Sequence, residues 1–233
     1  MDKIVILTGA GISAESGLGT FRDADGLWTK YPLEDVATPE GFARDPALVQ
    51  SFYNARRKGA AEAQHNAAHA ALARLQAAWP GEVVIVTQNV DGLHEAGGST
   101  GVIHMHGELA GALCSICDHR WTAPLEMQVN EPCPSCGGPG GRPDVVWFGE
   151  IPYHMDTILQ HLDEADLFVA IGTSGQVYPA AGFVQEAAGR GIPRIEMNLD
   201  PSETSPLFTE HLIGKATETV PAWVDDMLSK VAN

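Results

Sequence analysis

A glycine-rich turn near the N-terminus most constrains the fold of this chain. Residues 4–7 form an apolar run typical of a buried parallel strand, and Gly9, Gly11 and Ala14 after it fit the pattern G-x-G-x-x-G/A. Glycines tighten such a turn and let the backbone approach a pyrophosphate, which the N–H groups of the following helix start then face. A tight turn without any ligand fits the same residues, so this motif alone leaves nucleotide binding open.

The segment after this turn does not support a hydride-transferring dehydrogenase. Such an enzyme has a second strand and an acidic residue about 20 residues beyond the motif. Residues 20–28 instead form a polar loop with the turn signal Asp25-Gly26 and the aromatic residues Phe21 and Trp28. The turn therefore suits a nucleotide, but the second strand and acidic residue that would indicate hydride transfer are missing from this segment.

Further buried strands are predicted along the chain, and several end at small polar residues. They lie at residues 83–86, 145–148, 167–171 and 194–197, with another near 217–220. This is the pattern of a doubly wound parallel sheet, in which ligands bind beyond the carboxyl ends of the strands. Asn89 and Asp91, just after one strand, are thus functional candidates, although capping of the next helix would also explain them.

Capping residues predict where the helices begin. Thr38, Asp45 and Asn66 precede helix starts, and later helices open near Pro179 and Pro221. Tyr53 and Arg56 are three residues apart and share one face of the second helix. Spacing alone favours a core-edge aromatic residue and a solvated charge.

Two histidines are candidates for a general base. Residues 102–107 predict a short strand that places His104 and His106 on the same side. A histidine titrates near neutral pH, so either can take up a proton there. The spacing does not choose between them.

The four cysteines form two C-x-x-C pairs, Cys114 with Cys117 and Cys133 with Cys136. This spacing predicts one tetrahedral zinc ion, and four thiolates leave no position for water, so the ion should be structural. The insert, at about residues 110–141, is too small to fold without metal. Disulfides or free thiols fit less well without a secretory signal.

Charge and hydropathy limit the kinds of binding partner and the cellular location that we expect for this protein. The net charge of −16 argues against a nucleic-acid surface and is compatible with a basic peptide partner. No apolar run approaches the length of a transmembrane helix, and residues 1–8 do not form a signal peptide. We expect a cytoplasmic protein.

Taken together, these motifs resemble the sirtuins in order and spacing. The resemblance rests on residues 9–13, 20–22, 88–91 and 106–107, the cysteine pairs and residues 172–174, and it covers essentially the whole chain. Residues 52–57, Phe-Tyr-Asn-Ala-Arg-Arg, look like the class III branch, closest to bacterial CobB-type enzymes.

The resemblance implies a Rossmann-like doubly wound sheet at residues 1–30, 66–109 and 142–233. It also implies a helical insertion that forms the acyl pocket at 31–65 and a zinc-binding module at 110–141. The implied activity is NAD-dependent removal of acyl groups from protein lysines, with nicotinamide, deacylated lysine and O-acyl-ADP-ribose as products. NAD is then a co-substrate, one structural zinc ion is bound, and acyl-lysine proteins are the partners of what we expect to be a monomer.

The resemblance also assigns site residues. His106, in the His-Gly pair, matches the base and His104 does not; Asn89 is the second catalytic residue. Gly9, Ala10 and a helix starting near Ser13 hold the pyrophosphate, Phe21 and Arg22 belong to the cofactor loop, and Asn89 and Asp91 form the nicotinamide pocket. The full set of implied NAD contacts is Gly9, Ala10, Gly11, Ile12, Ser13, Phe21, Arg22, Trp28, Gln88, Asn89, Val90, Asp91, Gly172, Thr173, Ser174, Asn198, Leu199, Asp200 and Ala216.

For the acyl-lysine substrate the resemblance implies two sets of residues. Tyr53 and Arg56 bind a carboxylate-bearing acyl group, and Ala37 widens the tunnel, so succinyl- and malonyl-lysine should be good substrates and acetyl-lysine should be retained. The peptide should add as a strand between two edges formed by Val146, Trp147, Phe148, Gly149 and Glu150 and by Gly175 and Val177.

Three other readings compete with a deacylase. A mono-ADP-ribosyltransferase would have the same nucleotide site, so the sequence does not exclude it. A non-catalytic NAD sensor fits less well because His106, Asn89 and Asp91 are all present. The negative charge disfavours a zinc-ribbon nucleic-acid binder.

Overall fold

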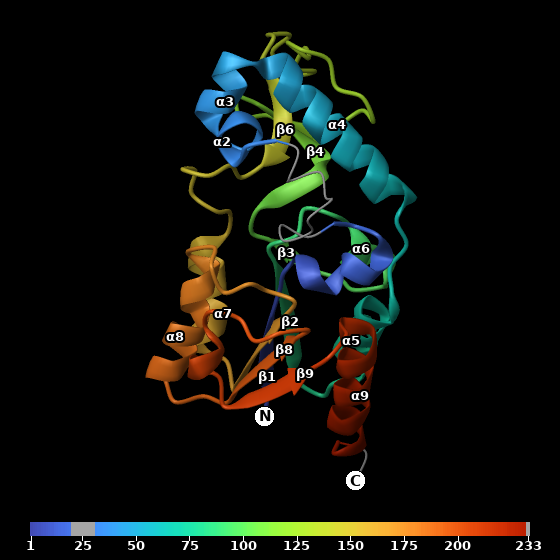
Figure 1. Cartoon of the computed structure of the whole chain (residues 1–233), viewed down its shortest axis with the longest axis vertical. Coiled ribbons are helices and arrows are strands. Elements are labelled where there is room, and N and C mark those ends of the chain that lie inside the picture. The colour runs from blue at the N-terminus through green and yellow to red at the C-terminus, as the bar shows by residue number, and fades with distance from the viewer. Residues whose placement is uncertain (20–30, 232–233) are drawn as a thin grey trace.

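The computed structural model, which describes residues 1–19 and 31–231, is built on a six-stranded parallel sheet (Figure 1). The strands are β1 (Lys3–Thr8), β2 (Glu82–Thr87), β3 (Ile103–His104), β7 (Leu167–Ile171), β8 (Arg194–Asn198) and β9 (Glu210–Ile213). Their order is β3-β2-β1-β7-β8-β9, and every neighbouring pair is parallel. Strands β2 and β3 therefore follow on one side of β1, and strands β8 and β9 follow on the opposite side of β7. The point where the order reverses lies between β1 and β7.

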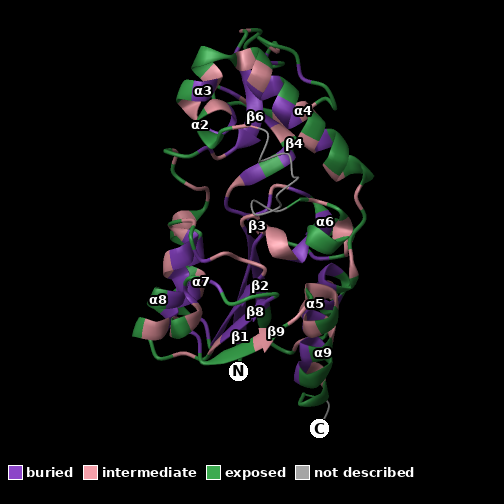
Figure 2. Cartoon of the chain, viewed as in Figure 1, coloured by how far each residue is buried: buried purple, intermediate pink, exposed green. Residues whose placement is uncertain are grey.

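Helices cover both faces of this sheet (Figure 1). In β1, Ile4 and Ile6 belong to the core under α5 (Ala67–Ala78) and α9 (Ala216–Ser229). The alternate residues Val5 and Leu7 belong to the core under α7 (Met155–Asp163) and α8 (Phe183–Gly189). Figure 2 shows the central strands as buried, and the edge strand β9 and the outer helix faces as largely exposed. The predicted doubly wound sheet is confirmed.

A second part lies beyond one end of this sheet (Figure 1). It contains α2 (Leu33–Val36), α3 (Pro39–Arg44), α4 (Pro46–Glu62) and the antiparallel strands β5-β4-β6. These strands are β4 (Gly107–Cys114), β5 (Arg120–Thr122) and β6 (Gly141–Val145). The small sheet therefore begins before residue 110 and continues past residue 141. The shared core contains Phe52, Tyr53, Leu109, Val145 and Trp147.

The predicted helix caps are confirmed. The Thr38 side chain accepts a hydrogen bond from the Gly41 N–H, and the Asp45 side chain accepts one from Leu48. The Asn66 side chain accepts from Ala68 at the start of α5. These caps depend only on nearby residues, which is why the sequence reveals them.

The segment after β1 is not the expected α-helix. Two 3-10 turns, η1 (Ala10–Ile12) and η2 (Ala14–Ser16), replace it and end at Gly17, whose φ is +83°. The hydroxyl of Ser13, between the two turns, contacts the His69 ring and accepts a hydrogen bond from Asn89. Contacts with distant residues thus hold the turn in a tighter form than a regular helix.

The C-terminal elements also differ from expectation. No strand forms at 217–220, because α9 begins at Ala216 and contains Pro221 in its interior. Val220, Trp223 and Val224 are buried at helical spacing against the sheet, and this packing outweighs the missing proline hydrogen bond. The last strand is instead β9, a mostly exposed edge strand of four residues in which only Leu212 and Ile213 are apolar, too few to form a recognisable run.

Two strand predictions need smaller corrections. The strand expected at 145–148 is β6, which ends at Val145, and residues 146–150 turn away while the Phe148 N–H bonds to the Ala37 carbonyl. The strand expected at 102–107 is β3, which ends at His104. His104 and His106 therefore do not share one strand face. Within the described residues, no helix is long and apolar enough to cross a bilayer.

Candidate functional site

The glycine loops after β1 and β7 meet at the switch point of the sheet. The Gly9 N–H donates to the Ile171 carbonyl at 3.0 Å, and the Gly11 N–H donates to the Gly172 carbonyl at 2.8 Å. A Cβ atom on Gly11 would lie 2.6 Å from the Gly172 Cα, and one on Gly172 would lie 2.4 Å from the Ile12 nitrogen. The glycines are thus needed for the approach of the two loops to each other. This is the position at which open α/β sheets bind ligands.

A single pocket of about 780 Å³ extends from these loops to α4. Its volume is in the range of cavities that hold a small molecule or cofactor, about 300–1,000 Å³. Of the predicted NAD contacts, Gly9, Ala10, Gly11, Ser13, Gln88, Asn89, Val90, Asp91, Gly172, Thr173, Ser174, Asn198, Leu199, Asp200 and Ala216 line it. His106 lines the same pocket, as do Ala37, Tyr53, Arg56, Val146, Trp147, Phe148, Gly149, Glu150 and Val177 from the predicted substrate set.

A few predicted residues lie elsewhere. Ile12 is fully buried in the core beneath the turn rather than at the pocket wall. Gly175 is not a lining residue and instead approaches the hydroxyl of Thr204. Phe21, Arg22 and Trp28 lie outside the described residues.

The sequence did not single out some lining residues. Met197, Gly214 and Lys215 line the pocket near the ends of β8 and β9. Gly214 and Lys215 were missed because the last strand was expected at 217–220, whereas Met197 was predicted only as part of the strand at 194–197. Gly214, the glycine that directly follows edge strand β9, is the sequence signal that could have located this loop.

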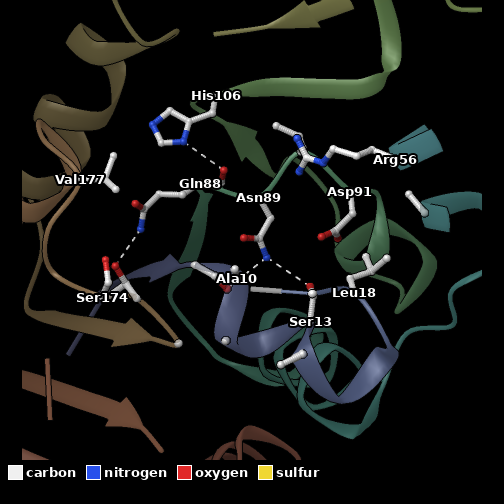
Figure 3. A pocket seen from close by; sticks show the side chains of 18 of the residues that line it. Ala10, Ser13, Leu18, Arg56, Gln88, Asn89, Asp91, His106, Ser174 and Val177 are labelled. Carbon is white, nitrogen blue, oxygen red and sulfur yellow. Dashed lines mark hydrogen bonds between the residues drawn. The ribbon is translucent and has the colours of Figure 1, made fainter. Parts of the chain in front are cut away.

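Asn89 is held firmly at the centre of the pocket (Figure 3). Its side-chain amide donates to the Gly9 carbonyl at 3.1 Å and to the Ser13 hydroxyl at 3.2 Å. Its backbone N–H donates to the Thr87 hydroxyl at 3.0 Å. Two side-chain bonds to the turn after β1 and one backbone bond to the end of β2 therefore hold Asn89 in place.

Asp91 lies both at the pocket wall and beside the start of a short helix. Its carboxylate accepts the Leu93 N–H at 3.1 Å just before α6 (Leu93–Ala96), whose N-cap residue is Gly92, and the residue also lines the pocket. Burial raises the pKa of Asp91, although the bond from Leu93 and the charge of Arg56 oppose this shift. In Figure 3, Arg56 reaches from α4 toward Asp91.

His106 carries an unprotonated ring nitrogen. Its Nδ1 lies 3.1 Å from the Gln88 carbonyl oxygen (Figure 3). A carbonyl only accepts hydrogen bonds, so Nδ1 carries the proton and the neutral ring has a basic Nε2. Burial lowers the pKa of His106 and outweighs the opposing effect of the Gln88 bond.

His104 has a different chemical state and does not line the pocket. Its Nδ1 lies 3.2 Å from the Asn89 carbonyl and its Nε2 lies 2.9 Å from the Glu95 carboxylate. Both partners are acceptors, so both ring nitrogens carry protons. Burial lowers the pKa of His104, but Glu95 and Glu108 outweigh this effect and leave the pKa raised. A protonated ring of this kind is a poor base.

The other end of the pocket is formed by α4 and the segment after β6. Tyr53 is buried and accepts a hydrogen bond from the Trp147 indole N–H at 3.0 Å, and the Arg56 guanidinium carbon lies 5.7 Å from the Tyr53 ring centre. Burial lowers the pKa of Arg56 and raises that of Tyr53. A cation and a phenol thus face one partly buried volume.

Both carboxylate oxygens of Glu150 accept hydrogen bonds from other residues of the protein. The Arg142 guanidinium donates to both of its carboxylate oxygens, at 2.7 and 2.9 Å, and the Trp147 N–H donates at 2.8 Å. Glu150 therefore shapes residues 147–150 at the pocket edge.

The four cysteines form a cluster suited to zinc. Their Sγ atoms all lie within 4.8 Å of one another, and the Cys114–Cys136 and Cys117–Cys133 separations are both 3.8 Å. Zinc–sulfur bonds of about 2.3 Å in a tetrahedron require sulfur atoms about 3.8 Å apart. The donors and their spacing therefore fit one four-coordinate zinc ion.

Comparisons with known proteins agree with this geometry. A family model described as the Sir2 family matches residues 9–179. A curated NAD-dependent protein deacylase of Caulobacter vibrioides is 57% identical over 233 residues, covering 98% of each chain. A solved Sir2 homologue in complex with NAD has a TM-score of 0.90 and 38% identity, covering 99% of this chain and 91% of that one. The structure of Sir2Af2 bound to a myristoylated histone peptide has a TM-score of 0.75 and 29% identity, covering 99% of this chain and 92% of the other.

Proposed function

The chain belongs to the Sir2 family and is an NAD-dependent protein deacylase, and we propose that it removes succinyl and malonyl groups as well as acetyl groups from protein lysines. The products are nicotinamide, the free lysine and O-acyl-ADP-ribose. The observation that carries the acyl preference is the pair Tyr53 and Arg56, which lines the pocket that also contains His106.

The chemistry of this pair suits a carboxylate at the end of the acyl chain. A guanidinium offers a bidentate fork to a carboxylate, and a phenol adds one donor. Because burial disfavours the charge of Arg56, an anion bound beside it is stabilised more than it would be in water. Ala37 is buried beside this region and lines the pocket, where its small side chain leaves space for the longer acyl groups.

The nucleotide half of the pocket is assigned to NAD. We propose that the Gly9–Gly11 turn holds the pyrophosphate and that Asn89 and Asp91 hold the nicotinamide. The adenosine half would be lined by Thr173, Ser174, Asn198, Leu199 and Ala216. Support comes from the position of all these residues in one pocket at the switch point.

His106 is assigned as the general base. Bound NAD would supply the ribose for the acyl oxygen and nicotinamide as the leaving group. The unprotonated His106 Nε2 then takes a proton from a ribose hydroxyl, while Nδ1 stays bonded to the Gln88 carbonyl. Expulsion of water from the pocket on substrate binding would strengthen these polar contacts.

The remaining parts have supporting roles. The cysteine cluster would hold a structural zinc ion, since four thiolates leave no open coordination site. The exposed Phe148 and the segment around Val177 are assigned to the peptide, which would pair through its main chain. We also propose a monomer that does not bind nucleic acid, in line with the net charge of −16.

The test compares one peptide in acetyl and succinyl forms with the variant Arg56→Met. Losing a charge-assisted contact should raise the KM for the succinyl peptide about 10- to 100-fold and change acetyl turnover little. Lys58→Met is the matched control, because Lys58 is an exposed cation on the same helix that does not line this pocket. An unchanged ratio of succinyl to acetyl rates in Arg56→Met would refute the acyl assignment. Intact-mass analysis of the peptide separates deacylation from ADP-ribosyl transfer, and His106→Tyr is the inactive control.

A further inference from the structure

Trp147 makes a contact that no catalytic step uses. The residue is only 2% exposed, and its indole Nε1 donates a hydrogen bond to the hydroxyl oxygen of Tyr53, which lies 94 positions earlier in the chain. Trp147 follows β6, whereas Tyr53 is on α4. The indole is therefore close enough to control the polar group at the acyl end of the pocket.

The direction of this hydrogen bond is fixed by chemistry. An indole N–H is a donor only, so the Tyr53 oxygen is the acceptor and its own proton must point away from Trp147. The Arg56 guanidinium, which also contacts Tyr53, has no acceptor either. The Tyr53 proton is thus directed to an acceptor other than these two neighbours.

The indole itself is held on several sides. The Arg142 guanidinium carbon lies 3.6 Å from the Trp147 ring centre, and the Phe42 ring centre lies 5.2 Å away. The Trp147 backbone N–H and the Arg142 guanidinium both bond to Glu150. An indole clamped in this way cannot rotate its N–H away from Tyr53 without breaking these contacts.

We propose that Trp147 is a positioning residue for acyl specificity, which orients the Tyr53 hydroxyl proton toward the carboxylate of a succinyl or malonyl group. This inference rests on the proposed acyl preference and deepens it. Without the indole donor, the phenol could turn its proton toward other acceptors, and the carboxylate would lose a prepared partner. An acetyl group has no carboxylate, so its turnover does not depend on this orientation.

The experiment is a double-mutant cycle between Trp147→Phe and Tyr53→Phe, with KM and kcat measured for succinyl and acetyl forms of one peptide. Trp147→Phe should raise the ratio of the succinyl KM to the acetyl KM about five- to tenfold, the usual scale of one hydrogen bond, beyond any loss that both peptides share from the change at the pocket wall. In the Tyr53→Phe background, where no hydroxyl remains, Trp147→Phe should add no further loss of succinyl specificity. Trp121→Phe, on β5 outside the pocket, is the matched control.

Two results would overturn the inference. One is an equal loss for succinyl and acetyl peptides in Trp147→Phe, which would mean general packing damage. The other is a succinyl-specific loss that persists undiminished in the Tyr53→Phe background. Should Trp147→Phe fold poorly, site-specific replacement of Trp147 by β-(3-benzothienyl)alanine keeps the ring shape without the N–H and gives the same two comparisons. An unchanged ratio of succinyl to acetyl rates in Arg56→Met would instead count against the proposed acyl preference itself.

Discussion

Glu196 on β8 offers a strong test of how the proposed adenosine side of the pocket is built. Its side chain is fully buried, and each carboxylate oxygen receives two hydrogen bonds. Oε1 accepts from the Asn198 amide at 3.1 Å and from the Ser202 N–H at 3.2 Å, while Oε2 accepts from the Ser205 hydroxyl and from His211 Nδ1 at 3.1 Å. The loop that follows β8 is thus organised around one carboxylate.

Glu196→Ala should destabilise the protein by about 4 kcal/mol. Asn198 and Ser202 are at most 9% exposed, so each loses an acceptor that water cannot readily replace, at about 1–3 kcal/mol per group. His211 is 41% exposed on its side chain and can bond to water instead, so it adds little. Because Asn198 lines the pocket, the KM for NAD should also rise about tenfold.

Glu196→Gln is the matched control and should cost about 1 kcal/mol or less. Its oxygen can keep the bonds from Asn198 and Ser202, while its NH2 group donates to Ser205 and to His211, both of which can also accept. The assay is urea unfolding followed by circular dichroism, together with the KM for NAD. Equal losses in the Ala and Gln variants, or a loss below about 1 kcal/mol for Ala, would refute this reasoning.

The pH dependence of stability gives a further check on Glu196. Burial alone would raise its pKa, but the bonds from Ser202, Ser205, His211 and Asn198 outweigh burial and leave the pKa lowered. A lowered carboxyl pKa stabilises the fold above the unfolded value, about 4.3, and this contribution disappears as the pH falls through the folded pKa. The stability advantage over Glu196→Gln should therefore shrink below about pH 4.3.

Two shorter predictions concern the base and the metal. Since burial lowers the pKa of His106, kcat/KM for an acetyl peptide should stay constant as the pH falls to about 6.5 and decline only below it. A decline in kcat/KM with its midpoint above about pH 7 would contradict a neutral buried base. Removal of metal by a chelator should release one zinc ion per chain and lower the melting temperature, because the cysteine cluster ties residues 114–136 together; an unchanged melting temperature would contradict a structural role.

Local signals account for what could be predicted from the sequence. The caps at Thr38, Asp45 and Asn66 depend on residues two or three positions away, and the cysteine spacing reports a cluster built from two short knuckles. The polar ends of buried strands located Asn89 and the Gly172 loop because parallel strands bring their carboxyl ends to one edge.

The remaining features depend on contacts between distant residues. No local pattern distinguishes β9, whose exposed residues pair with β8 only once the sheet exists. Pro221 suggests a helix start, yet α9 runs through it because the helix packs against the sheet. The pairing of Arg142 with Glu150 and the four bonds to Glu196 likewise follow from the completed fold.

The contact between Gly11 and Gly172 limits how this site can change during evolution or by engineering. A methyl group added at either position would meet the backbone of the opposite loop, so no substitution on the other side could make room for it. We therefore expect glycine at both positions in related sequences, with no case in which a substitution at one position is offset by a substitution at the other. An engineer who wants a different dinucleotide preference should leave both loops intact and vary the pocket rim, where Leu199 is 65% exposed and Asp200 stands beside it.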